Sequence, residues 1–219
     1  MAYPTVSAPY GLKPINLIGG QVFAGATRQL TIASAYGTSI FYGDLVTIVS
    51  GGTIQKDTGT TTATPCGVFL GCSYVNAQGQ VIFQQYYPAS TTAPTGTVIT
   101  AYVADDPDQL FKVVNVAGTT ADDAASGLLP AYLGRTMIGS NAQLVQNTGS
   151  TATGDSKVAI YSAAGATTTA TLPIRIVDVV PDTANSSGNF CEFIVKFNAP
   201  NVTGQTVAGG HQYLNPTGV

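Results

Sequence analysis

Short apolar runs separated by glycine, proline and polar residues constrain the fold of this chain more than any other feature of its sequence. The clearest example covers residues 39–74, where Gly51-Gly52 lies between two apolar runs. Paired glycines in this position predict a β-hairpin, because a two-residue type I′ turn needs a positive φ at both central positions. Gly67 and Gly71 interrupt a third run, residues 67–74, and predict β-bulges. We therefore expect a small β-barrel or sandwich around this stretch.

The rest of the chain continues in the same pattern. Further strands are predicted over residues 80–87, 98–103, 110–114, 144–146, 158–161, 172–180 and 190–197. The last of these has the most regular period of two, with Cys191, Phe193, Val195 and Phe197 on one face and Glu192, Ile194 and Lys196 on the other. A single short helix is predicted over residues 121–128, capped by Thr120 and ended by Gly127 and Pro130. The predicted fold class is all-β with minimal helix.

We divide the chain into an extended N-terminal arm (residues 1–35), a β-barrel-like domain (36–117), a β-sandwich-like region (118–198) and a C-terminal tail (199–219). A single two-layer sandwich is the alternative. Prolines favour an extended backbone in the arm, yet the arm is too apolar for a solvated tail. We expect it to dock on a neighbouring subunit, the alternative being a strand packed against its own domain.

The scarcity of charge excludes several classes of function. Only 9% of the residues are charged, against about 25% in typical soluble proteins. This indicates a surface covered by other subunits, the alternative being a Thr-rich β protein whose hydroxyl groups solvate it. The net charge is −3, and the eight basic residues are scattered singly, so we expect no nucleic-acid partner. No apolar run approaches the ~20 residues of a membrane span, and no signal peptide is recognisable, so we expect no membrane partner and assembly in the cytoplasm.

The cysteines are expected to remain free thiols. Cys66 and Cys72 fall in one predicted strand and would lie about 20 Å apart, whereas a disulfide needs Cα atoms about 5.5–6 Å apart. Cys191 is expected to face the core of its strand as a small apolar residue. Free thiols agree with cytoplasmic assembly.

No set of residues predicts catalysis, a cofactor or a metal. His211 is the only histidine, and its Gly-rich context lacks the orienting group that a catalytic base needs. Asp105, Asp106 and Asp108 are the densest carboxylate group, but they lack the rest of a calcium loop. We interpret them as turn or interface residues, with a bound cation as the alternative. The chain is therefore expected not to be an enzyme.

Several segments resemble a known family. They are residues 11–15 (GLKPI), 43–46 (GDLV), 66–71 (CGVFLG), 103–111 (VADDPDQLF), 154–156 (GDS), 172–176 (LPIRI) and 195–198 (VKFN). Together they are similar to the head decoration, or cement, proteins of tailed bacteriophages. The resemblance covers most of the chain and implies an all-β subunit that forms a homotrimer and binds major capsid protein subunits on the outside of the virion.

The expected function is therefore a virion structural protein that stabilises contacts between major capsid subunits. The residues expected to contact the capsid or other subunits are Tyr3, Pro4, Tyr10, Leu12, Pro14, Ile15, Ile18, His211, Tyr213 and Leu214. Deleting residues 1–18 is expected to abolish capsid binding and leave a folded core. The alternatives are a tail-tube or head–tail connector subunit, and a carbohydrate- or receptor-binding β module. For the last, Tyr86-Tyr87 is the adjacent aromatic pair available to a sugar.

Overall fold

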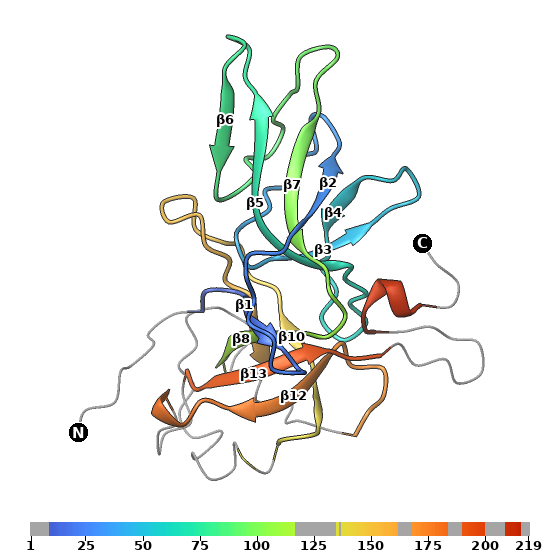
Figure 1. The fold of residues 1–219 in the computed structure, drawn as a ribbon, viewed down its shortest axis with the longest axis vertical. Helices are drawn as coiled ribbons and strands as arrows, with labels where there is room; N and C mark the ends of the chain where they lie inside the picture. Colours follow the sequence, from blue (N-terminus) through green and yellow to red (C-terminus); the bar gives the residue numbers. More distant parts are fainter. Residues whose placement is uncertain are drawn as a thin grey trace.

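The computed structural model describes residues 9–116, 135, 137–161, 168–183, 190–199 and 209–215, and it confirms an all-β fold (Figure 1). The strands are β1 (Lys13–Leu17), β2 (Arg28–Ile32), β3 (Leu45–Ile48), β4 (Ile54–Lys56), β5 (Gly67–Val75), β6 (Val81–Gln84), β7 (Ile99–Ala104), β8 (Gln109–Val116), β9 (Asn141–Ala142), β10 (Leu144–Val145), β11 (Ala159–Tyr161), β12 (Ile174–Val179) and β13 (Glu192–Phe197). Two 3-10 helices, η1 (Pro181–Thr183) and η3 (Gln212–Leu214), complete the described elements. The predicted helix at 121–128 lies outside the described residues.

Strands β2 to β7 form a nearly closed, barrel-like sheet. Their order is β3-β4-β2-β7-β5-β6, and an additional pairing of β3 with β5 joins the two sides of the ring. Strand β6 pairs with β5 outside this ring and lies with it in the upper part of Figure 1. The interior is filled by Ile32, Ile40, Val46, Ile54, Cys66, Phe69, Cys72, Tyr87, Ile99, Ala101 and Val103. Burial of these side chains provides the main driving force for closing this sheet.

The Gly51-Gly52 hairpin exists, but its predicted turn type is wrong. Strands β3 and β4 pair through Val46 with Lys56, and Val49 N–H donates to the Thr53 carbonyl at 2.9 Å. The loop between them therefore has three residues, and only the second glycine has a positive φ, of 74°. A three-residue loop needs one left-handed residue at its end, where a type I′ turn needs two in succession.

The predicted bulge in β5 is confirmed at Gly71. The pairing of β5 with β7 shifts register between Phe69 and Gly71, where the glycine has a φ of 138°. Gly67 serves a different purpose, because a Cβ at this position would lie 2.4 Å from the Ala104 carbonyl oxygen. The two glycines thus allow β5 to bend and to approach β7 closely.

The second sheet is assembled from distant segments. Its order is β10-β11-β8-β13-β12-β9, with β1 paired to β8 beside this path. In the lower part of Figure 1, β12 and β13 lie side by side below β1. The main core cluster joins this sheet to the barrel, since it includes Leu12, Leu45, Val68, Phe111, Phe193, Val195 and Phe197. One apolar core therefore spans both sheets.

The predicted inward face of the last strand is confirmed, as Cys191, Phe193, Val195 and Phe197 are all buried. The opposite face was expected to be polar and exposed, but Glu192 on this face is also buried. The described cysteines form no disulfide, as predicted, and all of them are buried.

The described part of the predicted arm belongs to the sheets of this chain. Strand β1 pairs with β8, and β2 pairs with β7 over five residue pairs. This corresponds to the alternative of strands packed against their own domain. The chain passes from the second sheet to the barrel-like sheet between β1 and β2, and returns to the second sheet between β7 and β8, at residues 105–108. The division into domains stays a prediction.

Candidate functional site

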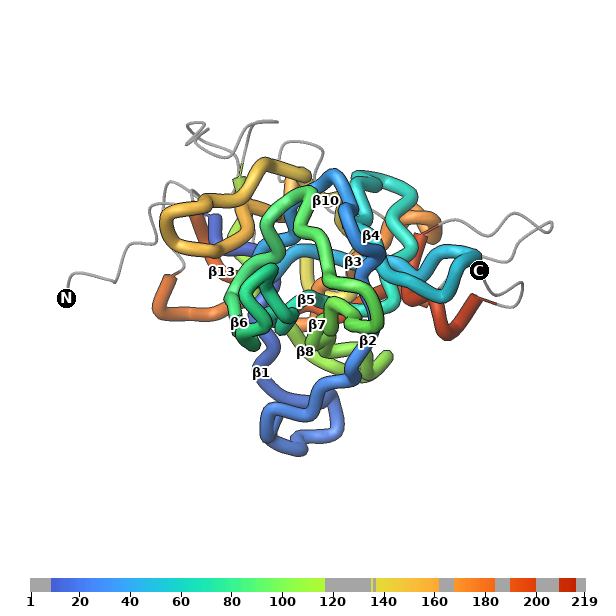
Figure 2. Tube along the Cα trace, turned by 90° about the horizontal axis from the view of Figure 1, so that it is seen from above, coloured from blue at the N-terminus to red at the C-terminus, as the bar shows by residue number. Residues whose placement is uncertain are grey.

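The turn between β7 and β8 brings together exposed apolar residues from both ends of the sequence. Ile18 N–H donates to the Asp108 carbonyl at 3.0 Å, and the Tyr213 hydroxyl donates to Asp105 Oδ2 at 2.9 Å. Ile18 is 51% exposed and Leu214 is 48% exposed. We call the surface formed by Ile18, Val22, Arg28, the 105–108 turn, Tyr213 and Leu214 the turn surface. The loop after β1, which carries Ile18 and Val22, projects from the rest of the chain in Figure 2.

Two of the three acidic residues of this turn pair with cations of the chain itself. Arg28 Nε lies 2.7 Å from Asp105 Oδ2, and Lys196 Nζ lies 3.1 Å from Asp108 Oδ1. The Arg28 guanidinium also lies 5.1 Å from the centre of the Tyr213 ring. Burial and the hydrogen bond to Asp105 raise the pKa of Tyr213. Within the described residues, no group of three or more His, Cys, Asp and Glu side chains could hold a metal ion.

The C-terminal segment at residues 209–215 is anchored across both sheets. The Gln212 side-chain amide pairs with the backbone N–H and C=O of Ile48, at 2.8 Å each. His211 N–H donates to the Asn198 carbonyl at 2.9 Å, and Gly210 N–H donates to the Ala63 carbonyl at 3.0 Å. The His211 ring packs edge-on against Phe197, with centroids 5.6 Å apart. These bonds fix η3 beside the turn surface.

His211 has a structural position in this segment. Its Nδ1 accepts a hydrogen bond from Tyr213 N–H at 3.2 Å, which caps η3. Burial lowers the pKa of His211, and Asp105 opposes this effect. The imidazole is completely buried and therefore not accessible to a substrate or a partner in this conformation.

The residues predicted to contact the capsid or other subunits differ in burial. Tyr3 and Pro4 lie outside the described residues; Leu12 and His211 are buried in the core; Tyr10, Pro14 and Ile15 are partly buried; Ile18, Tyr213 and Leu214 are exposed. Tyr10 donates its hydroxyl hydrogen to buried Glu192, which also pairs with Lys112. The apolar residues that indicated a docking arm pack largely within this chain, because β1 pairs with the edge of β8. The exposed residues are those at the turn surface.

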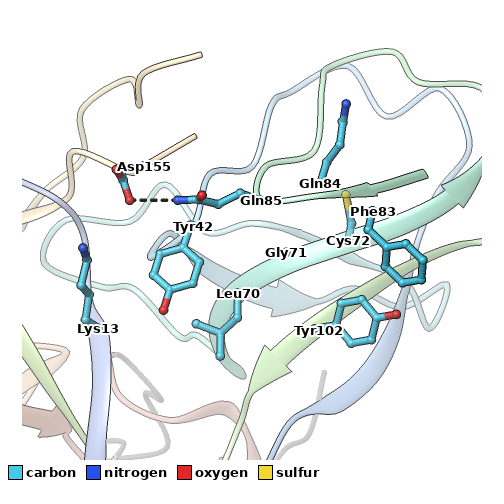
Figure 3. Close-up of a pocket in the computed structure, with 10 residues that line it drawn as sticks. All are labelled: Lys13, Tyr42, Leu70, Gly71, Cys72, Phe83, Gln84, Gln85, Tyr102 and Asp155. Carbon is cyan, nitrogen blue, oxygen red and sulfur yellow. Dashed lines mark hydrogen bonds between the residues drawn. The ribbon is translucent and has the colours of Figure 1, made fainter. Parts of the chain in front are cut away.

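A second feature is the groove beside β5, β6 and β7, which has a volume of about 580 Å³ (Figure 3). It is lined by Lys13, Tyr42, Leu70, Gly71, Cys72, Phe83, Gln84, Gln85, Tyr102 and Asp155. Figure 3 shows Lys13 and Asp155 at one end, Tyr42 and Leu70 in the middle, and Tyr102 and Phe83 at the other end. The groove thus has a charged end and an aromatic end.

The side chains of the groove are held by neighbouring groups. Tyr42 and Asp155 belong to short paired segments, in which Tyr42 N–H donates to the Gly154 carbonyl at 3.0 Å. Gln85 Nε2 donates to Asp155 Oδ1 at 3.1 Å, and the Tyr102 hydroxyl lies 3.1 Å from Ser73 Oγ. Burial and the charge of Asp155 raise the pKa of Tyr42. Fixed side chains lose less entropy when a ligand binds.

The adjacent pair Tyr86-Tyr87, expected from the sequence to be available to a sugar, does not line this groove. Tyr87 is completely buried, and Tyr86 stacks on Phe41 with centroids 5.3 Å apart, so adjacency in the sequence did not produce an exposed pair. The groove aromatics come from separate segments. The sequence signal that could have pointed to β6 is the predicted strand at residues 80–87, which contains Phe83 and no charged residue, whereas exposed edge strands usually carry charges.

A buried polar network connects the barrel to the second sheet. Lys56 Nζ lies 2.9 Å from Asp44 Oδ2, and Ser156 Oγ donates to Asp44 Oδ1 at 2.6 Å. Phe41 N–H also donates to Asp44 Oδ2, at 2.8 Å. Because both carboxylate oxygens are occupied, we interpret this network as a structural link and not as reactive groups.

Comparisons of this chain with protein-family models, with curated proteins and with solved structures found no match. The described residues contain no helix with the length and apolar character needed to cross a membrane.

Proposed function

We propose that this chain is a virion structural protein, a capsid decoration protein that binds the outside of a phage head and stabilises contacts between major capsid subunits. The observation that carries the proposal is the turn surface. Its exposed Ile18 and Leu214 come from distant segments and flank a turn in which Asp105 and Asp108 are paired with Arg28 and Lys196. The resemblance of the short sequence segments to decoration proteins and the low charge of the chain support the same function.

The composition of the turn surface suits binding to another protein. Tyrosine and arginine are enriched at the energetically dominant positions of interfaces, and Tyr213 and Arg28 lie together here with apolar neighbours. Ion pairs at the edge of such a surface mainly set orientation and association rate. The partners in this proposal are the major capsid protein and other copies of the chain, arranged as a homotrimer around a symmetry axis.

The test measures co-sedimentation of the purified chain with empty shells of the phage that encodes it. The chain is expected to co-sediment, and a double variant, Ile18→Asp with Leu214→Asp, is expected to lose about tenfold or more in apparent affinity. Val98→Asp is the matched control, because Val98 is 61% exposed just before β7, at the end of that strand opposite the turn. Its binding should equal that of the unchanged chain.

Deleting residues 1–18 would remove buried Leu12 and all of β1, so it would disturb the fold itself. Point substitutions on the turn surface are therefore the better test. Failure of the unchanged chain to co-sediment, or equal binding by the double variant, would overturn the proposal. Sedimentation equilibrium of the free chain tests the trimer separately.

A further inference from the structure

We propose that the groove beside β5, β6 and β7 is a binding site for an uncharged oligosaccharide. This inference depends on the groove alone and does not require the proposed role on a capsid. The groove lies along β5, β6 and β7 with Lys13 and Asp155 at one end (Figure 3), whereas the turn surface lies where β7 continues into the second sheet. Its volume of about 580 Å³ is within the range of about 300–1,000 Å³ that is usual for sites of small ligands.

The aromatic end of the groove offers flat apolar surfaces. Phe83 is 72% exposed on β6, and it lines the groove together with Tyr102, Tyr42 and Leu70. A single exposed phenylalanine needs no explanation, but one that joins other aromatic residues in a concave site does. Pyranose rings have an apolar face of C–H groups that packs on aromatic rings, while tyrosine can bind a hydroxyl at the same time.

The remaining lining residues supply hydrogen bonds of the kind that sugar hydroxyls use. Gln85 has both donors and acceptors, Asp155 has acceptors, and Lys13 has donors. A planar amide or carboxylate can bind two adjacent hydroxyls at once, because each hydroxyl both donates and accepts. Gln85 already donates to Asp155, so this pair is oriented before a ligand arrives.

The charges of the groove favour a neutral ligand. Lys13 and Asp155 are its charged lining residues, one of each sign, so their formal charges cancel. Lys13 Nζ lies 4.6 Å from the centre of the Tyr10 ring and 6.0 Å from that of Tyr42. Phosphate groups and acidic sugars would require an excess of cations, which these lining residues do not provide. A neutral sugar needs no such excess.

The test uses the purified full chain and an array of immobilised neutral and acidic oligosaccharides, followed by a titration of the best ligand observed by NMR. The expected result is retention on neutral oligosaccharides, with little change in affinity between low and high salt. Phe83→Ala is expected to weaken binding by about tenfold, as for loss of an aromatic contact, and Asp155→Asn by a similar factor. Shifted amide signals should map to the groove residues.

Val81→Ala is the matched control, because Val81 is 62% exposed on the same strand and does not line the groove. It should bind like the unchanged chain, and thermal unfolding of each variant checks that the fold is intact. The proposal is overturned if no neutral oligosaccharide is retained, if acidic ones alone bind, or if Phe83→Ala binds equally well. Occupation of the groove by a peptide or a second copy of the chain would also overturn it. Because no capsid is present, these outcomes are independent of the co-sedimentation test.

Discussion

The barrel-like sheet and the second sheet bury similar apolar side chains but collect their strands in different ways. Strands β2 to β7 follow one another without interruption by strands of the other sheet. The second sheet pairs Lys13 of β1 with Lys112 of β8, and Val114 of β8 with Glu192 of β13. The widest pairing in the barrel-like sheet joins Arg28 of β2 to Val103 of β7, 75 residues apart, whereas Lys13 and Lys112 are 99 residues apart. One sheet is therefore built from consecutive strands, and the other also joins segments from more distant parts of the chain.

This difference has a consequence for folding. Closing a long loop costs conformational entropy before any contact is formed, so sheets with distant partners form more slowly. We expect the barrel to form first and to present the edge on which the second sheet assembles. The shared core cluster, the Asp44 network and residues 209–215 then join the two sheets.

Breaking the Asp44 network is expected to have the largest effect on the connection between the sheets. Asp44→Ala leaves the largely buried Lys56 without its partner and should lower the free energy of unfolding by about 3–5 kcal/mol. Urea denaturation followed by tyrosine fluorescence measures the change. Asp108→Ala is the control, since this exposed ion pair with Lys196 should contribute less than about 1 kcal/mol. Equal effects of the two substitutions would refute the assigned role of the network.

Close packing of the segment before β1 against the barrel predicts the next largest effect. Gly11 has a φ of 77°, and a Cβ there would lie 2.6 Å from Ser156 Cβ and 2.7 Å from the Gly43 carbonyl oxygen. Gly11→Ala should destabilise the fold by about 3 kcal/mol through backbone strain and overpacking. Gly79→Ala has the same strain in open space and should cost about 1–2 kcal/mol. Differential scanning calorimetry of both variants tests whether packing adds to strain.

The buried His211 predicts a smaller, pH-dependent effect at the junction. Its pKa in the folded chain is lowered below the ordinary value of about 6.5. Its contribution to stability is therefore fully present above about pH 6.5. As the pH falls, the unfolded chain binds a proton that the folded imidazole does not, and stability decreases by at most about 1.4 kcal/mol per pH unit.

The measurement compares urea midpoints at about pH 7.5 and about pH 5.5 for the unchanged chain and for His211→Gln. The difference between the two pH values should be smaller in the variant. The opposing charges of Asp105 and Asp106 and the reinforcing charge of Lys196 are present in both proteins, so they do not produce this difference. An identical pH dependence would contradict the assignment to His211.

The smallest expected effect is a difference between the two sheets in the order in which their cysteines become reactive. Burial raises the pKa of Cys66 and of Cys72 to about 12, so a thiol reagent should not label either in the native chain near pH 8. With increasing urea, Cys191 should become reactive first, because it reports on the sheet with distant pairings. Mass spectrometry of digested samples identifies each labelled thiol. Earlier labelling of the barrel cysteines would reverse the proposed order.

Much of the local structure could be predicted from the sequence. The alternation from Cys191 to Phe197 predicted which side chains face the core, and the glycines within the β5 sequence predicted the bulge at Gly71. The candidate sites could not be predicted in the same way. Leu12 and Leu214 looked equally suited to a partner, yet one is buried and the other is exposed. Apolar composition does not distinguish a residue that covers its own core from one that covers a neighbour's core.

The sequence by itself determined the all-β class, most strand positions and the scarcity of charge, because these depend on residue types and on periodicities of a few residues. The tertiary structure decided that β1 pairs with β8, that Ile18 and Tyr213 meet at one turn, and that Tyr42, Phe83 and Tyr102 line one groove. The physical reason is that such contacts require the pairing of distant segments, whose free energy depends on the whole core and not on any short stretch of the chain.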